Sequence, residues 1–284
     1  MDWRDPPALP LGDAIAGAVD WVNTHARGGF DRISEALEGL IEGVTDALLW
    51  LHPLVAIALL AAGIGLLHRS WRLPLAAAAA FALVLNLGYW RETVETLALV
   101  LIATFFCMAV GVPVGIAAAH RRWLYTGIRP VLDLMQTIPP FVYLIPTLIL
   151  FGLGVVPGLI STIIFAIPAA IRLTHLGIAS VPAQLMEAAD SFGATRWQRL
   201  VKIELPHATP SILAGLTQCI MLSLSMVVIA ALVGADGLGE PVVRALNTVN
   251  IAMGFEAGLA IVLLAILLDR TVRVPRRRRP EAGP

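Results

Sequence analysis

Long apolar runs constrain the fold of this chain more than any other feature of its sequence. A helix rises about 1.5 Å per residue, so about 20 apolar residues are needed to cross a bilayer core of roughly 30 Å. The chain is 58% hydrophobic and 14% charged, and its apolar residues gather into runs of this kind. We therefore predict an all-α, polytopic membrane protein with about seven transmembrane helices, over residues 49–67, 73–90, 93–119, 131–151, 156–175, 209–233 and 251–268.

A polar segment precedes the first apolar run. Residues 1–47 contain nine acidic residues and three arginines. From Phe30 to Leu51, apolar residues recur at helical spacing with acidic residues between them, which predicts an amphipathic helix leading into the first span. A weaker amphipathic helix is expected from Leu11 to Val22. We expect the segment to lie on the membrane surface, and a regulatory or partner-binding role stays open.

These patterns divide the chain into four parts. They are an N-terminal amphipathic periplasmic segment (1–47), two N-terminal transmembrane helices (48–90), a core domain with five transmembrane helices (91–272) and a basic tail (273–284). The core domain contains a long polar loop, 181–207, between two strongly apolar segments. A membrane protein that exposes such a loop offers it to a partner or rests it on lipid, and the residues alone leave both open.

The sequence from Glu187 to Pro206, EAADSFGATRWQRLVKIELP, predicts two short amphipathic helices with a turn between them. Gly193 is placed where a left-handed residue would end the first helix. Thr195 and Gln198 have the T-x-x-Q spacing of a capping box, which would open the second helix, and Pro206 is expected to end it. The apolar faces would be formed by Leu185, Ala189 and Phe192 in the first helix and by Trp197, Leu200 and Val201 in the second.

This loop resembles the EAA loop of ABC importer permeases, the cytoplasmic element that docks on the ATP-hydrolysing subunit. The shared pattern is E-A-A, three residues, Gly, nine residues, Ile, one residue and Leu-Pro. The positions that match it are Glu187, Ala188, Ala189, Gly193, Ile203, Leu205 and Pro206. The resemblance implies that the first four seat in a groove of the ATPase and that the last three anchor the loop to the next span.

A wider resemblance, from about Leu97 to Asp269, is to the permeases for glycine betaine, proline and related quaternary amines. The segments that carry it are RPVLDLMQTIPPFVYLIP, FGLGVVPGLISTIIFAIPAAIRLTHLGI, LSMVVIAALVGADGLG and GFEAGLAIVLLAILLDR. Asp236 departs from the family pattern, where a small residue, usually Gly, is expected. The four arginines of the tail are a second departure.

The resemblance implies a type I importer permease in the bacterial inner membrane. Two copies of the chain would form the pathway between two cytoplasmic ATPase subunits, and an extracytoplasmic binding protein would deliver the substrate. ATP and Mg²⁺ would lie on the ATPase, so this chain is expected to bind no cofactor of its own. Membrane lipid is a further expected partner, and nucleic acid is not.

The distribution of basic residues predicts the orientation. With the EAA loop in the cytoplasm, fifteen of the twenty lysines and arginines fall on the inner side. The five on the outer side are Arg4, Arg27, Arg32, Arg91 and Arg244. This bias predicts a periplasmic N-terminus and a cytoplasmic C-terminus. We interpret the run Arg276–Arg279 as a topology anchor near anionic lipid.

Motifs of enzyme chemistry are missing from the sequence. A P-loop requires Gly-Lys-Ser or Gly-Lys-Thr, but Lys202, the one lysine, follows Val201. ATP hydrolysis must therefore come from another polypeptide. The six histidines are scattered without an H-E-x-x-H pattern, and no metal site is expected. Cys107 and Cys219 both fall within apolar runs, which favours packing thiols over a disulfide.

Polar and proline residues within the spans are candidates for the transport pathway or gate, because burying ionisable groups in a membrane is costly. These candidates are Asp133, Gln136, Pro139, Pro140, Phe141, Tyr143 and Arg172. A broken fourth helix that lines a cavity is the functional interpretation of the two prolines, and a packing kink is the structural one. Likewise, Asp133 and Arg172 either serve the pathway or pair with one another.

Two alternative functions stay open. The first alternative, within the same class of protein, is an ABC permease for another solute, such as methionine or an alkanesulfonate. A self-sufficient secondary transporter is the second, and it would transport without ATP or a second protein. Within the favoured function, the spans contain few aromatic residues to cage a quaternary ammonium group, so we expect the binding protein to make most of the selection.

Overall fold

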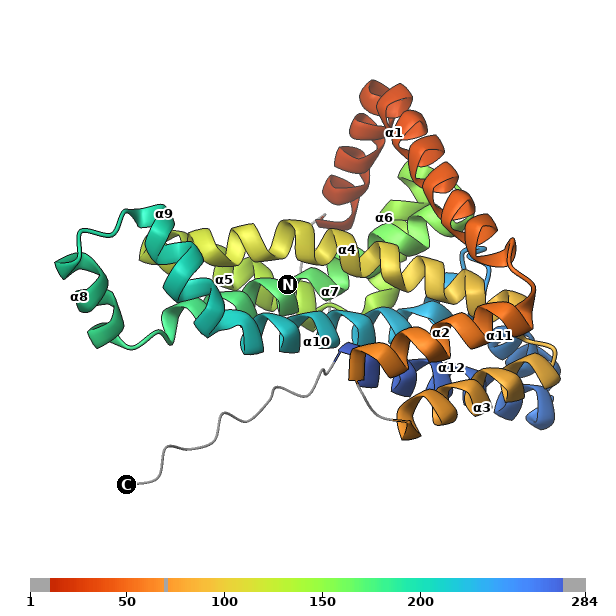
Figure 1. The fold of residues 1–284 in the computed structure, drawn as a ribbon. Helices are drawn as coiled ribbons and strands as arrows, with labels where there is room; N and C mark the ends of the chain where they lie inside the picture. Colours follow the sequence, from red (N-terminus) through yellow and green to blue (C-terminus); the bar gives the residue numbers. More distant parts are fainter. Residues whose placement is uncertain (1–10, 69–70, 273–284) are drawn as a thin grey trace, which may run out of the picture.

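The computed structural model describes residues 11–68 and 71–272, and every regular element in these ranges is helical (Figure 1). The predicted all-α fold is confirmed. The tail 273–284, with its four arginines, lies outside the described residues, as do residues 1–10. The helices are α1 (Leu11–Leu49), α2 (Pro53–His68), α3 (Arg72–Asn86), α4 (Trp90–His120), α5 (Arg122–Thr137), α6 (Pro140–Phe151), α7 (Val155–Ala179), α8 (Ala183–Ser191), α9 (Arg196–Arg199), α10 (Leu205–Ala231), α11 (Gly239–Thr248) and α12 (Ile251–Val272), with a π-helical segment at Leu200–Glu204.

Four helical stretches are long and apolar enough to span a membrane: α4, α7, α12 and the continuous stretch Arg196–Ala231. Two further candidates are bent pairs, α1 with α2 and α5 with α6, and α3 is a shorter apolar helix. Each of the predicted spans overlaps one of these elements, so the chain is a polytopic helical membrane protein. With 16 and 15 residues, α2 and α3 reach only about 23 Å to 24 Å at 1.5 Å per residue.

The core of the molecule is formed by α4, α7 and α10, which run side by side along its length (Figure 1). Small residues bring these helices close together. A Cβ atom on Gly115 of α4 would lie 2.7 Å from the Ile171 carbonyl oxygen, and one on Gly177 of α7 would lie 2.8 Å from Ser211 Cβ. Cys107 and Cys219 are free and fully buried in this core, as predicted for packing thiols.

The N-terminal segment differs from the prediction of two amphipathic helices. Leu11–Leu49 is one helix, and the Gly28–Gly29 pair inside it costs only about 1 kcal/mol of helix propensity per residue. Ile41 is 6% exposed and packs against apolar side chains of α4 and α7. The rings of Phe30 and Phe151 meet edge to face at 5.2 Å. The second half of α1 therefore packs on the helical bundle.

The predicted fourth span, 131–151, is not a single helix. The chain bends by 97° between α5 and α6, after Thr137. Neither Pro139 nor Pro140 has an N–H group for helical bonding, and a residue that precedes proline avoids the α region. Ile138 and Pro139 accordingly adopt ψ angles of 129° and 135°. The predicted interruption of the fourth span at Pro139 and Pro140 is therefore confirmed, and the interruption is a sharp bend between two helices.

A short helix that was not predicted, α11, lies between α10 and α12 at the end of the molecule opposite α8 and α9 (Figure 1). The turn that leads into it contains Gly234 and Gly237, with φ of +89° and +114°. This turn is fixed to α4, because the Leu238 N–H donates a hydrogen bond of 2.8 Å to Thr96 Oγ1. Thr96 is 1% exposed, so the contact is buried.

Candidate functional site

The polar loop forms the predicted pair of helices, and we call residues 183–204 the EAA hairpin. It lies at one end of the molecule, beyond the ends of the long core helices (Figure 1). Gly193 ends α8 with a φ of +69°, which confirms the predicted left-handed glycine. The N–H groups of Gly193 and Ala194 bond the carbonyls of Asp190 and Ala189. These bonds satisfy the end of the helix in the manner of a Schellman motif.

Side-chain contacts fix α9 and hold it against α8. The capping box is confirmed: the Gln198 N–H donates to Thr195 Oγ1 at 3.3 Å, and the Thr195 N–H donates to Gln198 Oε1 at 2.8 Å. Arg199 donates to Asp190 across the hairpin at 2.7 Å. Sequence reasoning missed this ion pair, because no helical period links residues on two helices.

The second helix of the hairpin does not end at Pro206. The chain passes from α9 through the π-helical segment Leu200–Glu204 into α10. The Leu205 N–H bonds the Leu200 carbonyl five residues earlier, which is the wide spacing of a π turn. Pro206 lies in the first turn of α10, a position where a missing N–H is tolerated. The prediction that Pro206 ends the helix is therefore wrong.

The motif residues occupy two different settings on the hairpin. Glu187 and Ala188 are exposed, whereas Ala189 is buried. Ile203 and Leu205 are partly buried where the hairpin joins α10. Glu187 and Ala188 are thus accessible to a partner, and Ile203 and Leu205 adjoin the core. The buried Ala189 and the exposed Pro206 do not follow the division of roles that the motif implies.

The hairpin also exposes large apolar side chains. Phe192 is 91% exposed and Trp197 is 70% exposed, and Leu185 and Val201 are exposed by 46% and 41%. The predicted apolar faces thus point largely outward. On the face predicted for the first helix, Ala189 is buried and the other two residues are exposed. Exposed apolar side chains of this size on a polar hairpin are typical of a protein–protein contact.

Two of the pathway candidates pair with one another. Arg172 of α7 donates a hydrogen bond of 2.5 Å to Asp133 of α5, and Arg129 lies 4.0 Å from the same carboxylate. Arg172 Nε is buried and has no hydrogen-bond partner among the described residues. The ion pair that we considered as the structural alternative is therefore present, and it joins the bent segment to the core.

The other pathway candidates lie around the bend between α5 and α6. The Tyr143 hydroxyl donates to the Met135 carbonyl at 3.0 Å and so bridges the two helices across the bend. Gln136 is exposed, and Phe141 is 55% exposed. A role for this group in the pathway stays a prediction.

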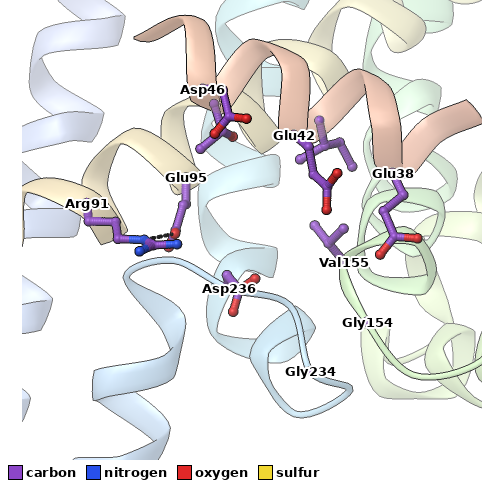
Figure 2. A pocket seen from close by; sticks show the side chains of 11 residues that line it. Glu38, Glu42, Asp46, Arg91, Glu95, Gly154, Val155, Gly234 and Asp236 are labelled. Atoms are coloured by element: carbon purple, nitrogen blue, oxygen red, sulfur yellow. Dashed lines mark hydrogen bonds and ion pairs between the residues drawn. The ribbon is translucent and has the colours of Figure 1, made fainter. Parts of the chain in front are cut away.

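An acidic cavity of about 510 Å³ is lined by the second half of α1, the start of α4 and the turn before α11 (Figure 2). The start of α4 and α11 lie at the end of the molecule opposite the hairpin (Figure 1). Three carboxylates from one face of α1 point into the cavity, and α4 and the turn before α11 supply the others (Figure 2). Arg91 pairs with Glu95 at 2.8 Å on its rim. The carboxylates are those of Glu38, Glu42, Asp46, Glu95 and Asp236. Such a surface attracts cationic groups by its summed charge. Sequence reasoning assigned the α1 acids to a solvated helix face and so missed the cavity.

Comparisons with known proteins agree with this geometry. The family model described as "Binding-protein-dependent transport system inner membrane component" matches residues 111–279. The glycine betaine transport system permease protein OpuAB of Bacillus subtilis is 44% identical, over 97% of this chain and 99% of its own length. The glycine betaine/carnitine transport permease protein GbuB of Listeria monocytogenes is 44% identical over 93% and 94%, and the Escherichia coli glycine betaine/proline betaine permease protein ProW is 42% identical over 95% and 76%.

The fold itself is similar to that of a solved transporter. A chain of the inward-facing MetNI methionine ABC transporter aligns with a TM-score of 0.57 at 24% identity, over 65% of this chain and 94% of that one. A helical membrane bundle that carries a projecting EAA hairpin defines the membrane subunit of a solute importer. The chain belongs to the ABC importer permeases, in the betaine family. It is a multi-pass inner membrane protein. Membership of this family implies an ATPase and a substrate-binding protein as partners.

Proposed function

We propose that this chain forms the membrane pathway of an ATP-driven importer for glycine betaine and related osmolytes, and that it couples hydrolysis by a partner to alternating access. The observation that carries the proposal is the EAA hairpin, which projects beyond the bundle and is continuous with α10 (Figure 1). A partner that moves this hairpin acts directly on a core helix. The chain binds no cofactor itself, and ATP and Mg²⁺ lie on the ATPase.

The motif residues of the hairpin have two roles in coupling. Glu187, Ala188, Ala189 and Gly193 seat in the ATPase groove, and Ile203, Leu205 and Pro206 anchor the hairpin to α10. The exposure of Glu187 and Ala188 and the partial burial of Ile203 support this assignment. The exposed rings of Phe192 and Trp197 add an apolar contact that loses water when the ATPase docks.

The working importer contains two copies of this chain, two ATPase subunits and an extracytoplasmic binding protein. The N-terminus lies outside and the C-terminus in the cytoplasm, with the basic tail near anionic lipid. The bias of basic residues towards the hairpin side of the spans supports this orientation. In this orientation the acidic cavity faces the outside of the cell.

The substrate class follows from the relatives, whose names share glycine betaine. A quaternary ammonium group is typically held by the faces of aromatic rings. The Tyr143 hydroxyl is bonded to the α5 backbone, so this ring is fixed at the bend. We therefore assign most of the selectivity to the binding protein. Exchanging that protein for one of another specificity should change the substrate taken up, and an unchanged preference would contradict this assignment.

The proposed function is tested by reconstitution. The chain is expected to co-purify with its ATPase and, in liposomes with the binding protein, to take up glycine betaine only when ATP is hydrolysed. Replacing both Phe192 and Trp197 by Ser should abolish co-purification, while Trp123→Ser, which changes an equally exposed ring outside the hairpin, should not. Uptake by this chain alone without ATP would instead identify a secondary transporter.

A further inference from the structure

A buried acidic residue lies at the base of the EAA hairpin. Among the residues that the structure describes, Glu204 is the only Asp, Glu, Lys or Arg that is buried, with 2% exposure. Its Oε2 atom lies 2.7 Å from Nε2 of His120, which precedes it by 84 residues. A buried carboxylate without a partner is strongly unfavourable, so this contact is not an incidental surface pair.

The contact joins two elements that nothing in the local sequence connects. Glu204 is the last residue of the π-helical segment through which the hairpin continues into α10. His120 is the last residue of α4, and its side chain is 42% exposed. A cavity of about 520 Å³ lies beside the pair, lined by Ala117, Arg121, Arg196 and Arg199 as well. The hairpin therefore has room to move against α4, and the pair holds it there.

The π turn gives this contact a structural role. A π turn contains one residue more than an α turn, and conversion between the two would rotate the hairpin by about 100° relative to α10 and shift it by about 1.5 Å. Conversion would also carry the Glu204 side chain away from the end of α4. The hydrogen bond with His120 thus opposes the conversion and fixes the direction of the hairpin.

We propose that Glu204 and His120 are positioning residues that tie the EAA hairpin to the end of α4, so that a movement of the hairpin is passed to α4 as well as to α10. Since α4 is in close contact with α7, the contact between Glu204 and His120 links the movement of all three core helices to that of the hairpin. The role in transport rests on the proposed function, but the tie itself is a property of this chain.

The test compares two substitutions of the partly exposed His120. His120→Gln keeps an N–H donor at about the place of Nε2, whereas His120→Asn has the same amide on a side chain one methylene shorter. In liposomes that contain the permease, the ATPase and the binding protein, glycine betaine uptake per ATP hydrolysed should stay near wild type for His120→Gln. It should fall roughly threefold to tenfold for His120→Asn. This ratio does not depend on the amount of folded protein. Equal ratios for the two variants would overturn the proposal.

A second measurement needs no transport. Spin labels placed through Trp123→Cys and Trp197→Cys, at exposed positions beside α4 and on the hairpin, report their separation in the permease alone. The native Cys107 and Cys219 are fully buried and so are shielded from the label. The distance distribution should broaden in His120→Asn and stay narrow in His120→Gln. Identical distributions would overturn the tie, whereas a wild-type complex that fails to take up glycine betaine would contradict only the proposed function.

Discussion

Arg172 of α7 donates a hydrogen bond of 2.5 Å to Asp133 of α5, across 39 positions of the chain. This is the ion pair that connects the bent segment α5–α6 to the core helices. The side chains of Arg172 and Asp133 are 35% and 52% exposed, so we expect the pair to add little to the free energy of unfolding. Its contribution is to the position of α5.

Breaking this pair should therefore affect transport more than stability. We expect Arg172→Gln to lower the free energy of unfolding by about 1 kcal/mol or less. ATP-driven uptake should fall severalfold, because α5 and the bend lose their link to α7. Uptake in liposomes and thermal unfolding in detergent measure the two effects. The exchange of both charges, Asp133→Arg with Arg172→Asp, should recover part of the uptake, and no recovery would show that the pair is not the relevant contact.

Gly193 provides a second prediction. Its φ of +69° is strained for a side chain with a branched Cβ, although a Cβ atom there would meet no other atom within 4 Å. Gly193→Val should therefore distort the turn of the hairpin at a cost of about 1–2 kcal/mol. Gly193→Asn, which tolerates left-handed backbone, should not. The ratio of ATP hydrolysed to substrate transported should rise in the Val variant alone. Equal coupling in both variants would contradict the turn geometry.

The contact between α4 and α7 provides a third prediction. A methyl group on Gly115 would lie 2.7 Å from both the Ile171 carbonyl oxygen and Thr174 Cβ, so Gly115→Ala must push the two helices apart. We expect a loss of about 1–3 kcal/mol in the free energy of unfolding, as for other overpacked cores. Gly127→Ala on α5 is the matched control, because nothing lies within 4 Å of its added carbon. That change should be neutral or slightly stabilising, and equal melting temperatures for the two variants would contradict the close contact.

The turn before α11 provides a fourth prediction. Thr96 Oγ1 accepts the Leu238 N–H and donates to the Glu92 carbonyl, in a fully buried setting. Thr96→Val keeps the shape but leaves the Leu238 N–H without an acceptor, which should cost about 1–3 kcal/mol. Thr96→Ser keeps the hydroxyl and should cost less. Denaturant unfolding of both variants measures the difference, and a Val variant as stable as the Ser variant would show that the bond is replaceable.

The parts of the fold that sequence reasoning predicted correctly are those governed by local rules. Span positions follow from apolar length, and the capping box at Thr195 and the left-handed Gly193 follow from hydrogen bonding and backbone sterics over a few residues. The break at Pro139 and Pro140 was also visible. The size of the bend, 97°, depends on how α6 packs, and no local rule supplies that.

The parts that were missed depend on contacts between distant residues. Pro206 was expected to end a helix, but the helix continues past it through a π turn. The buried Glu204, the last residue of that turn, has its partner His120 at the end of α4. The acidic cavity needs α1, α4 and the turn before α11 in one place (Figure 2). Charge patterns along one helix describe a solvated face and a cavity wall equally well.

The continuity of Arg196–Ala231 has a consequence for how the two faces of the membrane communicate. These 36 residues form one helical stretch, which at 1.5 Å per residue is a rod about 54 Å long. One end of the rod is the hairpin, and the other leads into the turn at Gly234 and Asp236 that walls the acidic cavity. Under the proposed coupling, we expect a torque applied at the hairpin to reach the far surface without a relay of separate elements. In the opposite direction, we expect a protein that binds at the rim of the cavity to affect the position of the hairpin through the same helix.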